Sequence, residues 1–327
     1  MSSEIKKIAV FTSGGDAPGM NAGIRAVVRA CVYHNIEVFG VYRGYDGLIE
    51  NDIVKLNARS VSNIIQRGGT ILKSARCDEF RTPEGRQKAY ENLKNRNIDA
   101  LIAIGGNGTF TGLHVFYEQF GIPAICLPGT IDNDLPGMDY TIGYDTATNT
   151  AVEAIDKIRD TALSHNRLFF IEVMGRHSGY IAINSGIAGG AVSIVIPEAE
   201  TPIDELIAQL DVGAENNKKS SLVVVAERGQ SGSVWEIADQ VKEKAPYYDI
   251  KVTILGHLQR GGSPTYFDRV LASRLGVAAV EGLLEGKKDV MIGVKDNQIV
   301  YVDFDRVNNQ RHEIDDESLR LAKILSI

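Results

Sequence analysis

Two acidic residues, Asp132 and Asp134, stand two positions apart in the stretch LPGTIDNDLPG, residues 127–137. The stretch follows an apolar run, so the sequence predicts that a buried strand ends just before the acids. Asp, Asn, Gly and Pro favour turns, and a turn alone would explain this composition. A carboxylate in such a place can also take a proton from a substrate hydroxyl. The other polar loops of the chain bear on the choice between the two interpretations.

Two glycine-rich loops have the composition of phosphate-binding loops. TSGGDAPGMN (12–21) joins a predicted strand to a predicted helix, and Gly14 and Gly15 permit a turn whose amide groups point outward beside the helix N-terminus. It matches neither a Walker A motif nor a G-x-G-x-x-G fingerprint, and an ordinary strand–helix turn is the alternative. IAIGGNGTFTG (102–112) is a second glycine-rich loop after an apolar run, with two threonine hydroxyls.

Basic side chains follow several predicted strands. Arg76, in SARCDEFRTPEGR (74–86), could clamp a phosphate, and EVMGRHSGY (172–180) and GHLQRGGSP (256–264) each place a His and an Arg beside glycines. Solvated arginines and structural histidines are the alternatives. Glu227 ends an apolar run and is expected to meet Arg228 or a substrate hydroxyl, because an unpaired buried carboxylate is costly. Phosphate-type loops, strand-end arginines and a carboxylate pair together indicate phosphoryl transfer from a nucleotide to a hydroxyl.

The elements that must position these loops alternate along the chain. Helices are predicted over 21–33, 84–96, 146–163, 204–216, 234–244 and 265–285. The apolar runs between them are 8–11, 38–42, 100–106, 122–129, 168–175, 191–198, 221–229 and 252–262. Near-continuous apolar strands separated by helices indicate parallel sheets covered on both faces. We therefore predict an α/β fold of two Rossmann-like doubly wound domains, with the strand-end loops converging on one cleft.

Composition argues against several other classes of protein. The 327-residue chain has a net charge of −7, which disfavours general affinity for nucleic acid. Its 3 cysteines are scattered, as suits free thiols in a reducing compartment. No run approaches the roughly 18 apolar residues of a membrane-spanning helix, and the start does not resemble a signal peptide. A cytoplasmic protein without membrane or nucleic-acid partners is expected.

In order and spacing, these loops closely resemble those of bacterial ATP-dependent 6-phosphofructokinases over practically the whole chain. TSGGDAPGMNAGIR, RGGT…SAR, IGGNGT, PGTIDND, EVMGRHSG and GHLQRGGSP carry the resemblance. It implies ATP as phosphoryl donor, fructose 6-phosphate as acceptor at its 1-hydroxyl, Mg²⁺ as cofactor and a place in glycolysis. It also implies a larger nucleotide-binding domain (1–142 plus 257–308) and a smaller sugar-phosphate-binding domain (143–256 plus 309–327).

The resemblance further implies roles for individual residues. Asp132 takes the hydroxyl proton and contacts the metal, Asp134 helps to orient the hydroxyl, and Thr130 binds the transferred phosphoryl group. The implied catalytic set is completed by Gly15, Arg76 and Arg176. The implied substrate-binding residues are Thr130, Asp132, Arg167, Met174, Gly175, Arg176, Glu227, Lys251, His257 and Arg260. The implied nucleotide-binding residues are Gly15, Tyr45, Arg76, Cys77, Gly106, Asn107, Gly108, Thr109, Thr111 and Gly112.

The family is usually a homotetramer, and the resemblance therefore implies sites shared between subunits. Arg167 and Lys251 correspond to two basic residues that bind the sugar phosphate of a neighbouring subunit, although the second is normally Arg. An effector site for ADP or phosphoenolpyruvate is also implied. Val192 and Ser220 stand in it where an acid and a His are common, so its switching behaviour is open. Its implied basic residues are Arg25, Arg29, Arg59, Arg159 and Lys218.

Asn107 is the main departure from the family pattern, which has a metal-binding Asp at this position. Asn retains the shape but loses the charge, so weaker Mg²⁺–nucleotide binding and slower turnover are expected. Two alternatives follow: a pyrophosphate-dependent phosphofructokinase, or a low-activity or non-catalytic regulatory paralogue. Gly108 and Gly129 favour ATP, because pyrophosphate-dependent relatives carry Asp and Lys there, which fill the space of the ATP α-phosphate.

Overall fold

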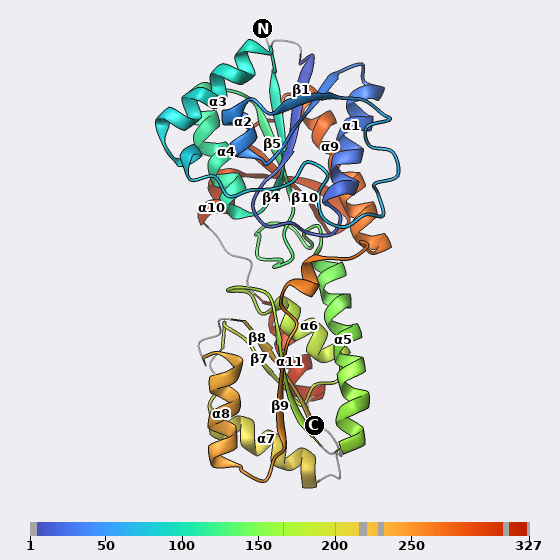
Figure 1. The fold of residues 1–327 in the computed structure, drawn as a ribbon, viewed down its shortest axis with the longest axis vertical. Helices are drawn as coiled ribbons and strands as arrows, with labels where there is room; N and C mark the ends of the chain where they lie inside the picture. Colours follow the sequence, from blue (N-terminus) through green and yellow to red (C-terminus); the bar gives the residue numbers. More distant parts are fainter. Residues whose placement is uncertain are drawn as a thin grey trace. The chain divides into compact units, whose positions relative to one another are not determined.

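Figure 1 shows the computed structural model of the chain, which describes residues 5–165, 167–199, 201–215, 221–227, 232–309 and 314–325. The chain divides into two compact units. The first unit comprises residues 1–131, 135–146 and 260–312, and the second comprises 132–134, 147–259 and 313–327. These are structural units; the assignment of nucleotide and sugar-phosphate binding to separate domains stays a prediction.

The first unit is built on a seven-stranded sheet in the order β11–β10–β5–β4–β1–β2–β3. Its central strands pair in parallel, and β3 and β11 run antiparallel at the two edges. The chain passes from β1 to β2 on one side and returns to β4 on the other, which creates a topological switch point. The strands are β1 (Lys7–Thr12), β2 (Glu37–Val41), β3 (Ile53–Leu56), β4 (Ala100–Gly105), β5 (Ala124–Pro128), β10 (Val290–Lys295) and β11 (Gln298–Asp303).

Helices cover both faces of this sheet (Figure 1). α1 (Met20–Tyr33) and α9 (Tyr266–Leu284) pack together on one face. The other face carries α2 (Tyr45–Glu50), α3 (Pro83–Asn95), α4 (Asn107–Phe120), α10 (Phe304–Asn309) and the short 3₁₀ helix η1 (Glu79–Arg81). Successive strand residues point to opposite faces, so Ala9 and Phe11 join the core under α2–α4. Ile104 lies on the α1 side, where a Cβ on Gly23 would come within 3.0 Å of it.

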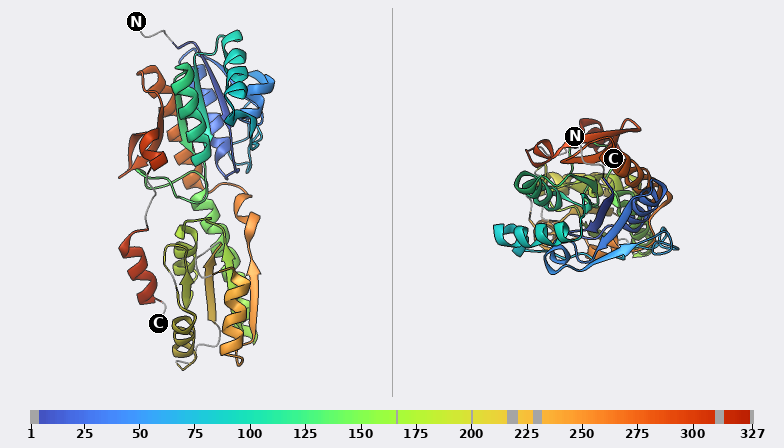
Figure 2. Two further views of the ribbon diagram at one scale, coloured as in Figure 1. Left: turned by 90° about the vertical axis from the view of Figure 1, so that its left-hand side faces the viewer. Right: turned by 90° about the horizontal axis from the view of Figure 1, so that it is seen from above.

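The second unit contains a four-stranded, fully parallel sheet in the order β7–β8–β6–β9. Its strands are β6 (Leu168–Val173), β7 (Ser193–Val195), β8 (Ser221–Ala226) and β9 (Ile250–Ile254). Its helices are α5 (Tyr144–His165), which begins in the first unit, α6 (Tyr180–Ala188), α7 (Ile203–Glu215), α8 (Val234–Lys244) and α11 (Asp316–Leu325), with the 3₁₀ helix η2 (Gly256–Arg260). α7 and α8 enclose one core with the sheet. α6 and α11 pack against each other and against β7 (Figure 2). The predicted α/β fold with mostly parallel sheets is thus confirmed.

All six predicted helices are present, as α1, α3, α5, α7, α8 and α9, with ends within two residues of the prediction. The prediction was wrong for residues 107–112, which are the first turns of α4 and not a loop. Gly and Thr are poor helix formers, but burial of Phe110, Leu113 and Phe116 below them outweighs that preference. The runs 191–198 and 252–262 are strands only over β7 and up to Ile254. Among the described residues, none of the helices is both long and apolar enough to span a bilayer.

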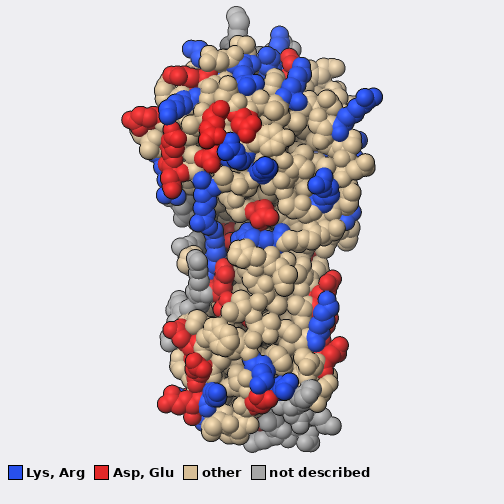
Figure 3. Space-filling view, in the orientation of Figure 1, with Lys and Arg blue, Asp and Glu red and all other residues tan. Residues whose placement is uncertain are grey.

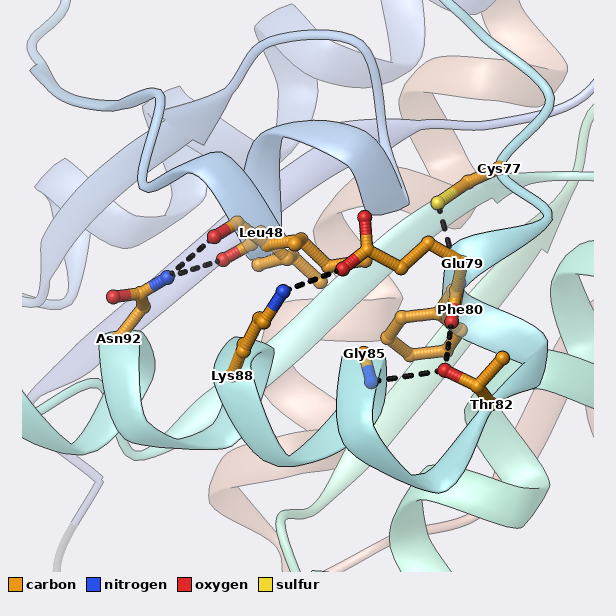
Figure 4. Close-up of polar contacts among 9 residues, drawn as sticks. Leu48, Cys77, Glu79, Phe80, Thr82, Gly85, Lys88 and Asn92 are labelled. Atoms are coloured by element: carbon orange, nitrogen blue, oxygen red, sulfur yellow. Dashed lines mark hydrogen bonds and ion pairs between the residues drawn. The ribbon is translucent and has the colours of Figure 1, made fainter.

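The segment before α3 is tied to its neighbours by polar contacts (Figure 4). The Thr82 hydroxyl accepts a hydrogen bond from the Gly85 amide at 3.0 Å and donates to the Glu79 carbonyl at 2.7 Å. Lys88 pairs with the Glu79 carboxylate at 2.8 Å. The Asn92 amide group donates to the Leu48 and Ile49 carbonyls, both at 2.9 Å, and so satisfies the end of α2. These contacts hold residues 79–82 against α3, and α3 against the end of α2.

Thr82→Ala should lower the free energy of unfolding by about 1 kcal/mol, because it removes the N-cap of α3. Urea denaturation followed by circular dichroism measures this change. Thr82→Ser, which keeps the hydroxyl, is the matched control and should lose only a few tenths. Equal losses for Ala and Ser would contradict the cap.

Candidate active site

The two glycine-rich segments of the first unit lie side by side at the switch point between β1 and β4. The Ser13 amide donates to the Ile104 carbonyl at 3.1 Å, and the Thr109 hydroxyl donates to the Ser13 carbonyl at 3.3 Å. A Cβ on Gly105 would lie 2.6 Å from the Ser13 carbonyl oxygen, so only glycine permits this approach. Ligands of open α/β sheets bind at such a place.

The N-terminus of α4 is suited to bind an anion. Gly106 is its N-cap residue and provides no side-chain cap, while the Thr109 amide donates to the Gly106 carbonyl at 2.9 Å. The first amides of a helix are left over by its hydrogen-bond ladder and carry the positive end of its dipole. Gly108 faces open space, because a Cβ there would meet no atom within 4 Å. Asn107 is exposed beside it. The helix start therefore presents donors and room for a phosphate group.

Tyr45 contacts Thr109 and Gly112 in the first turns of α4. Tyr45 is 5% exposed, stacks on Phe80 with ring centroids 3.9 Å apart, and donates to the Thr109 carbonyl at 2.5 Å. A Cβ on Gly112 would lie 2.8 Å from the Tyr45 hydroxyl oxygen. The Thr111 hydroxyl is on the exposed side and donates to the Asn107 carbonyl at 3.1 Å. Tyr45 thus fixes the first turns of α4 from below.

Thr130 lies next to this anion site, directly after β5. The Gly129 amide donates to the Gly105 carbonyl at 2.9 Å, and a Cβ on Gly106 would lie 3.7 Å from the Thr130 Cβ. Thr130 is 8% exposed. A Cβ on Gly129 would come within 2.9 Å of both Ile104 and Met20. Packing alone therefore requires a small residue at Gly129, whatever the phosphoryl donor.

Gly15, Arg76 and Arg260 border the first unit's loops. Arg76 is exposed. Arg260 donates from Nη1 to the Asp16 carbonyl at 3.0 Å, and a Cβ on Gly15 would lie 2.7 Å from the same nitrogen. Arg260, predicted to hold the sugar phosphate, therefore rests on the loop after β1.

Cys77 is half-buried, and its Sγ accepts from the Phe80 amide at 3.4 Å. Burial, followed by a hydrogen bond to the Asp46 carboxylate, raises the pKa of the Cys77 thiol to about 12. A thiol held in its neutral form is a poor nucleophile. Cys77 is consequently suited to packing and to contact with a ligand, not to covalent chemistry.

Arg176 and Glu227 meet at the carboxyl ends of β6 and β8 in the second unit. The Glu227 amide donates to the Val173 carbonyl at 2.8 Å, and its carboxylate accepts from the Arg176 amide at 3.2 Å. Arg176 has a φ of 55°, and Gly175, with a φ of 149°, has no room for a Cβ because it would collide with the Ser178 carbonyl. The expected partner Arg228 lies outside the described residues; the Arg176 amide is a partner that the sequence did not suggest.

Asp132 belongs to the second unit and lies beside Arg176. Asp132 is 3% exposed, and its Oδ2 lies 3.9 Å from Nε of Arg176. A guanidinium at this distance stabilises the charged form of a carboxylate, which a general base needs. Asp134 is half-buried. Asp132 is thus buried beside an arginine, and neither acid lies in a fully exposed turn.

Gln259 completes this end of the second unit, and the sequence analysis missed it. It is 0% exposed and accepts from the Met174 amide at 2.8 Å, so it fixes the backbone just before Gly175 and Arg176. His257, in the same 3₁₀ helix, is exposed. No pattern in the sequence singles out Gln259, because its neighbours Leu258 and Arg260 give no sign that it is buried.

Arg167 and Lys251 lie at the opposite, amino end of the same sheet. They share the Asp249 carboxylate, with Arg167 Nε at 2.9 Å from one oxygen and Lys251 Nζ at 2.7 Å from the other. Both bonds lower the pKa of Asp249. The six residues of β6 separate this pair from Arg176 by roughly 20 Å. Within a single copy of the second unit, the predicted substrate-binding residues are therefore too far apart for all of them to contact one small molecule.

The predicted effector residues are distributed over both units. Arg25 and Arg29 lie one turn apart on α1, and burial, followed by the charge of Arg29, lowers the pKa of Arg25. Arg59 is exposed, whereas Arg159 donates to the Gly189 carbonyl and, at 3.0 Å, to the Gly190 carbonyl. Val192 is buried, and Lys218 and Ser220 lie outside the described residues. On the face in Figure 3 each unit carries both acidic and basic side chains, so anion recognition there depends on particular groups.

The donor set fits a magnesium ion that arrives with a nucleotide. Within the described ranges, no three or more His, Cys, Asp or Glu side chains are grouped so that they could hold a metal. Mg²⁺ commonly uses one or two carboxylates and completes its shell with phosphate oxygens and waters. The second unit has two such carboxylates, Asp132 and Asp134, and the first unit has the exposed amide side chain of Asn107.

Comparison with known proteins identifies the family. The family model described as Phosphofructokinase matches residues 7–283. The chain belongs to the phosphofructokinase family. It is 57% identical over 322 residues to the ATP-dependent 6-phosphofructokinase of Cytophaga hutchinsonii, covering 98% of each chain. It is 54% identical to the ATP-dependent 6-phosphofructokinase 2 of Bacteroides thetaiotaomicron, covering 99% of each.

A solved structure agrees with this assignment. Phosphofructokinase from Saccharomyces cerevisiae matches with a TM-score of 0.88 and 37% identity, over 97% of this chain and 46% of the yeast chain. The resemblance derived from the sequence motifs is therefore confirmed at the level of the family and of the fold. The roles of individual residues stay predictions.

Iodoacetamide should modify Cys77 about 100-fold more slowly than free cysteine at pH 8. The raised pKa lowers the thiolate fraction by on the order of 10³, and the greater intrinsic nucleophilicity of a high-pKa thiolate offsets part of this loss. Peptide-level mass spectrometry over time measures the rate. Asp46→Asn should accelerate the reaction, and Asp52→Asn is the charge-matched control. A rate equal to that of free cysteine would refute the account of Cys77.

Proposed function

We propose that this phosphofructokinase transfers the terminal phosphoryl group of ATP to the 1-hydroxyl of fructose 6-phosphate and forms fructose 1,6-bisphosphate. The observation that carries the proposal is the 54–57% identity, over nearly the full length, to proteins named ATP-dependent 6-phosphofructokinase. An anion site at the α4 N-terminus and a buried carboxylate beside an arginine support it, because phosphoryl transfer needs positioned donors and a proton acceptor.

In this mechanism the first unit binds the nucleotide, and the second supplies most of the residues that bind the sugar phosphate. The amide groups at Gly106–Thr109 and the loop after β1 bind phosphates, with Gly15, Arg76 and Cys77 along the nucleotide. Asp132 accepts the proton of the 1-hydroxyl, which leaves late in a loose transition state, so an ordinary carboxylate is basic enough. Thr130 donates to the transferred group, and Asp134 helps to orient the hydroxyl. Arg176 stabilises the developing charge, and Met174, Gly175, Glu227, His257 and Arg260 hold the sugar phosphate.

Asp132, Asp134 and Asn107 are the residues proposed to hold Mg²⁺, which would supply positive charge against the phosphates. Asn107 supplies a neutral oxygen where the family pattern expects a carboxylate. Such a change weakens electrostatic stabilisation, which is often the largest catalytic contribution. We therefore propose a working enzyme with a high magnesium requirement, and a non-catalytic paralogue is the second candidate that Asn107 favours.

ATP is the proposed donor in preference to pyrophosphate. The open space at Gly108 leaves room for an α-phosphate, and an Asp side chain there would occupy it. Gly129 adds less support than the sequence suggested, because packing explains it independently. A cytoplasmic location is part of the proposal, as for a glycolytic enzyme.

We also propose that the active site is shared between subunits of a homotetramer. Arg167 and Lys251 lie at the amino end of the sheet whose carboxyl end carries Arg176 and Glu227, so they suit the sugar phosphate of a neighbouring subunit. Arg25, Arg29, Arg59, Arg159 and Lys218 are proposed to bind ADP or phosphoenolpyruvate as an effector.

The purified protein should form fructose 1,6-bisphosphate with ATP and not with pyrophosphate, in a coupled assay across a range of Mg²⁺ concentrations. Asn107→Asp should raise kcat by about tenfold or more and lower the Mg²⁺ concentration for half-maximal rate, because it restores an anionic ligand. Asn63→Asp, outside the glycine-rich segments, is the charge-matched control. No product with either donor, and no rescue by Asn107→Asp, would favour the non-catalytic paralogue.

Two inactive variants should restore activity when they assemble together. Asp132→Asn removes the base, at a cost of about 10²–10⁴ in kcat, and Arg167→Ala with Lys251→Ala removes the neighbour's cations. Refolding the two variants together forms hybrid oligomers, in which some sites combine Asp132 of one subunit with Arg167 and Lys251 of its neighbour. Mixing the variants after they have folded does not form such hybrids. Asp132→Asn mixed with Arg176→Ala is the control that should stay inactive. Failure of the first mixture would place each site within one chain.

A further inference from the structure

Asp268 is a buried acid that the proposed chemistry does not use. It lies in the first turn of α9 and is 0% exposed. Burying a carboxylate is costly unless hydrogen bonds replace its hydration. An apolar side chain could fill the same space at a lower free-energy cost. The role of Asp268 must therefore come from the hydrogen bonds that its carboxylate accepts.

Three donors from one short segment converge on the Asp268 carboxylate. The Gly143 amide donates to Oδ1 at 2.8 Å, and the amide and hydroxyl of Thr146 donate to Oδ2 at 2.9 and 2.5 Å. These groups form the start of α5, which begins at Tyr144. Asp268 thus caps α5 from another helix, with its charge at the positive end of the α5 dipole.

The segment that Asp268 fixes is the end of the loop that carries the proposed catalytic residues. That loop leaves β5 after Pro128 and is closed at its base, where the Ile142 amide donates to the Pro128 carbonyl at 2.8 Å. The Thr141 hydroxyl donates to the Thr130 carbonyl at 2.7 Å. The position of Thr130 therefore depends on the placement of residues 141–146.

The loop after β1 packs against the same place. A Cβ on Gly143, which has a φ of 101°, would lie 2.7 Å from the Ala17 Cβ. A Cβ on Gly19 would lie 2.8 Å from Ile142 and 3.5 Å from the Asp268 Cβ. Both glycines permit a backbone approach that larger residues would block, so the phosphate-type loop and the end of the catalytic loop are packed on one buried carboxylate.

The segment before α9 joins the same network. Thr265 is the N-cap of α9, where its hydroxyl accepts from the Asp268 amide at 3.3 Å and donates to Asp145 at 2.6 Å. Its own amide donates to the Thr146 hydroxyl at 3.0 Å. Arg260 precedes it by five residues and donates to the Asp16 carbonyl.

We propose that Asp268 is a positioning residue for phosphoryl transfer. It fixes the relative positions of the loop after β1, the Thr130 loop and the Arg260 segment. The proposal rests on the proposed function. Asp268 touches no reacting atom; it sets where Thr130 and the amide donors lie. A displacement of about 1 Å in such groups can cost about 10²-fold in rate.

The protonation state of Asp268 suits this role at neutral and alkaline pH. Burial raises the pKa of Asp268 to about 6, with a smaller contribution from Asp145, and the donors at Thr146 and Gly143 oppose the rise. Above that pH the carboxylate is ionised and can accept all three bonds. Assays are therefore best made at pH 8.

Asp268→Asn tests the proposal through a separation of kcat from KM. Its amide has one acceptor oxygen for three donors, so we expect kcat at pH 8 to fall at least about tenfold while KM for ATP and for fructose 6-phosphate changes less than about threefold. Rates are expressed per folded protein, from circular dichroism, at a temperature well below melting. A purely structural role would lower the melting temperature and leave the corrected kcat unchanged, which would overturn the proposal.

A second pair of variants decides the matter if Asp268→Asn does not fold. Thr146→Val keeps the shape but removes the hydroxyl that joins Asp268 to Thr265, and Thr146→Ser keeps that hydroxyl. We expect kcat to fall severalfold for Val and to be restored in Ser. Equal corrected kcat values for both variants would overturn the positioning role. Absence of product from the unmodified protein would instead overturn the proposed function, so the two failures are distinguishable.

Discussion

The contact between the Ser13 carbonyl and the start of α4 is the constraint on which the first unit depends. It brings a loop and a helix N-terminus together at the one place in the sheet where strand order reverses. Glycine at position 105 is the condition for that contact, since any Cβ would meet the Ser13 carbonyl. Tyr45 then supports α4 from the core side, and the helix start is left open toward ligand. The shape of this helix start is thus set by the close approach of backbone segments and not by side-chain charge.

The second unit builds its site by another route. Here polar and charged side chains gather at the strand ends, and backbone hydrogen bonds orient two of them: the Arg176 amide donates to Glu227, and the Met174 amide donates to Gln259. Arg176 adopts a left-handed backbone conformation, which is uncommon for a residue with a side chain and is held by the neighbouring contacts. The two units therefore differ in the chemistry of their strand ends, with backbone amide donors in the first and paired charges in the second.

The sequence predicted the repetitive part of the fold well and the irregular part poorly. Apolar spacing predicts α1, α3, α5, α7, α8 and α9, because a long amphipathic pattern matches the 3.6-residue period of a helix and not the two-residue period of a strand. α4 was missed because glycine and threonine at its start disguise a helix that tertiary packing stabilises. The β10–β11 hairpin was missed although Asp296 and Asn297, both with positive φ, are a recognisable two-residue turn signal. The motif residues were predictable from resemblance, but Gln259 and Asp268 were not, since a single sequence does not reveal which polar residues are buried.

The shared hold of Asp249 on Arg167 and Lys251 has a thermodynamic consequence for any anion that these cations bind. The Asp249 carboxylate competes with the anion for the two cations. It is bound to both before the anion arrives, and some of these contacts must break when the anion binds. The energy of that exchange, and not the full attraction of two bare cations, sets the net affinity. Because Lys251 is a flexible point charge and Arg167 a planar fork, the lysine contact is the easier of the two to give up.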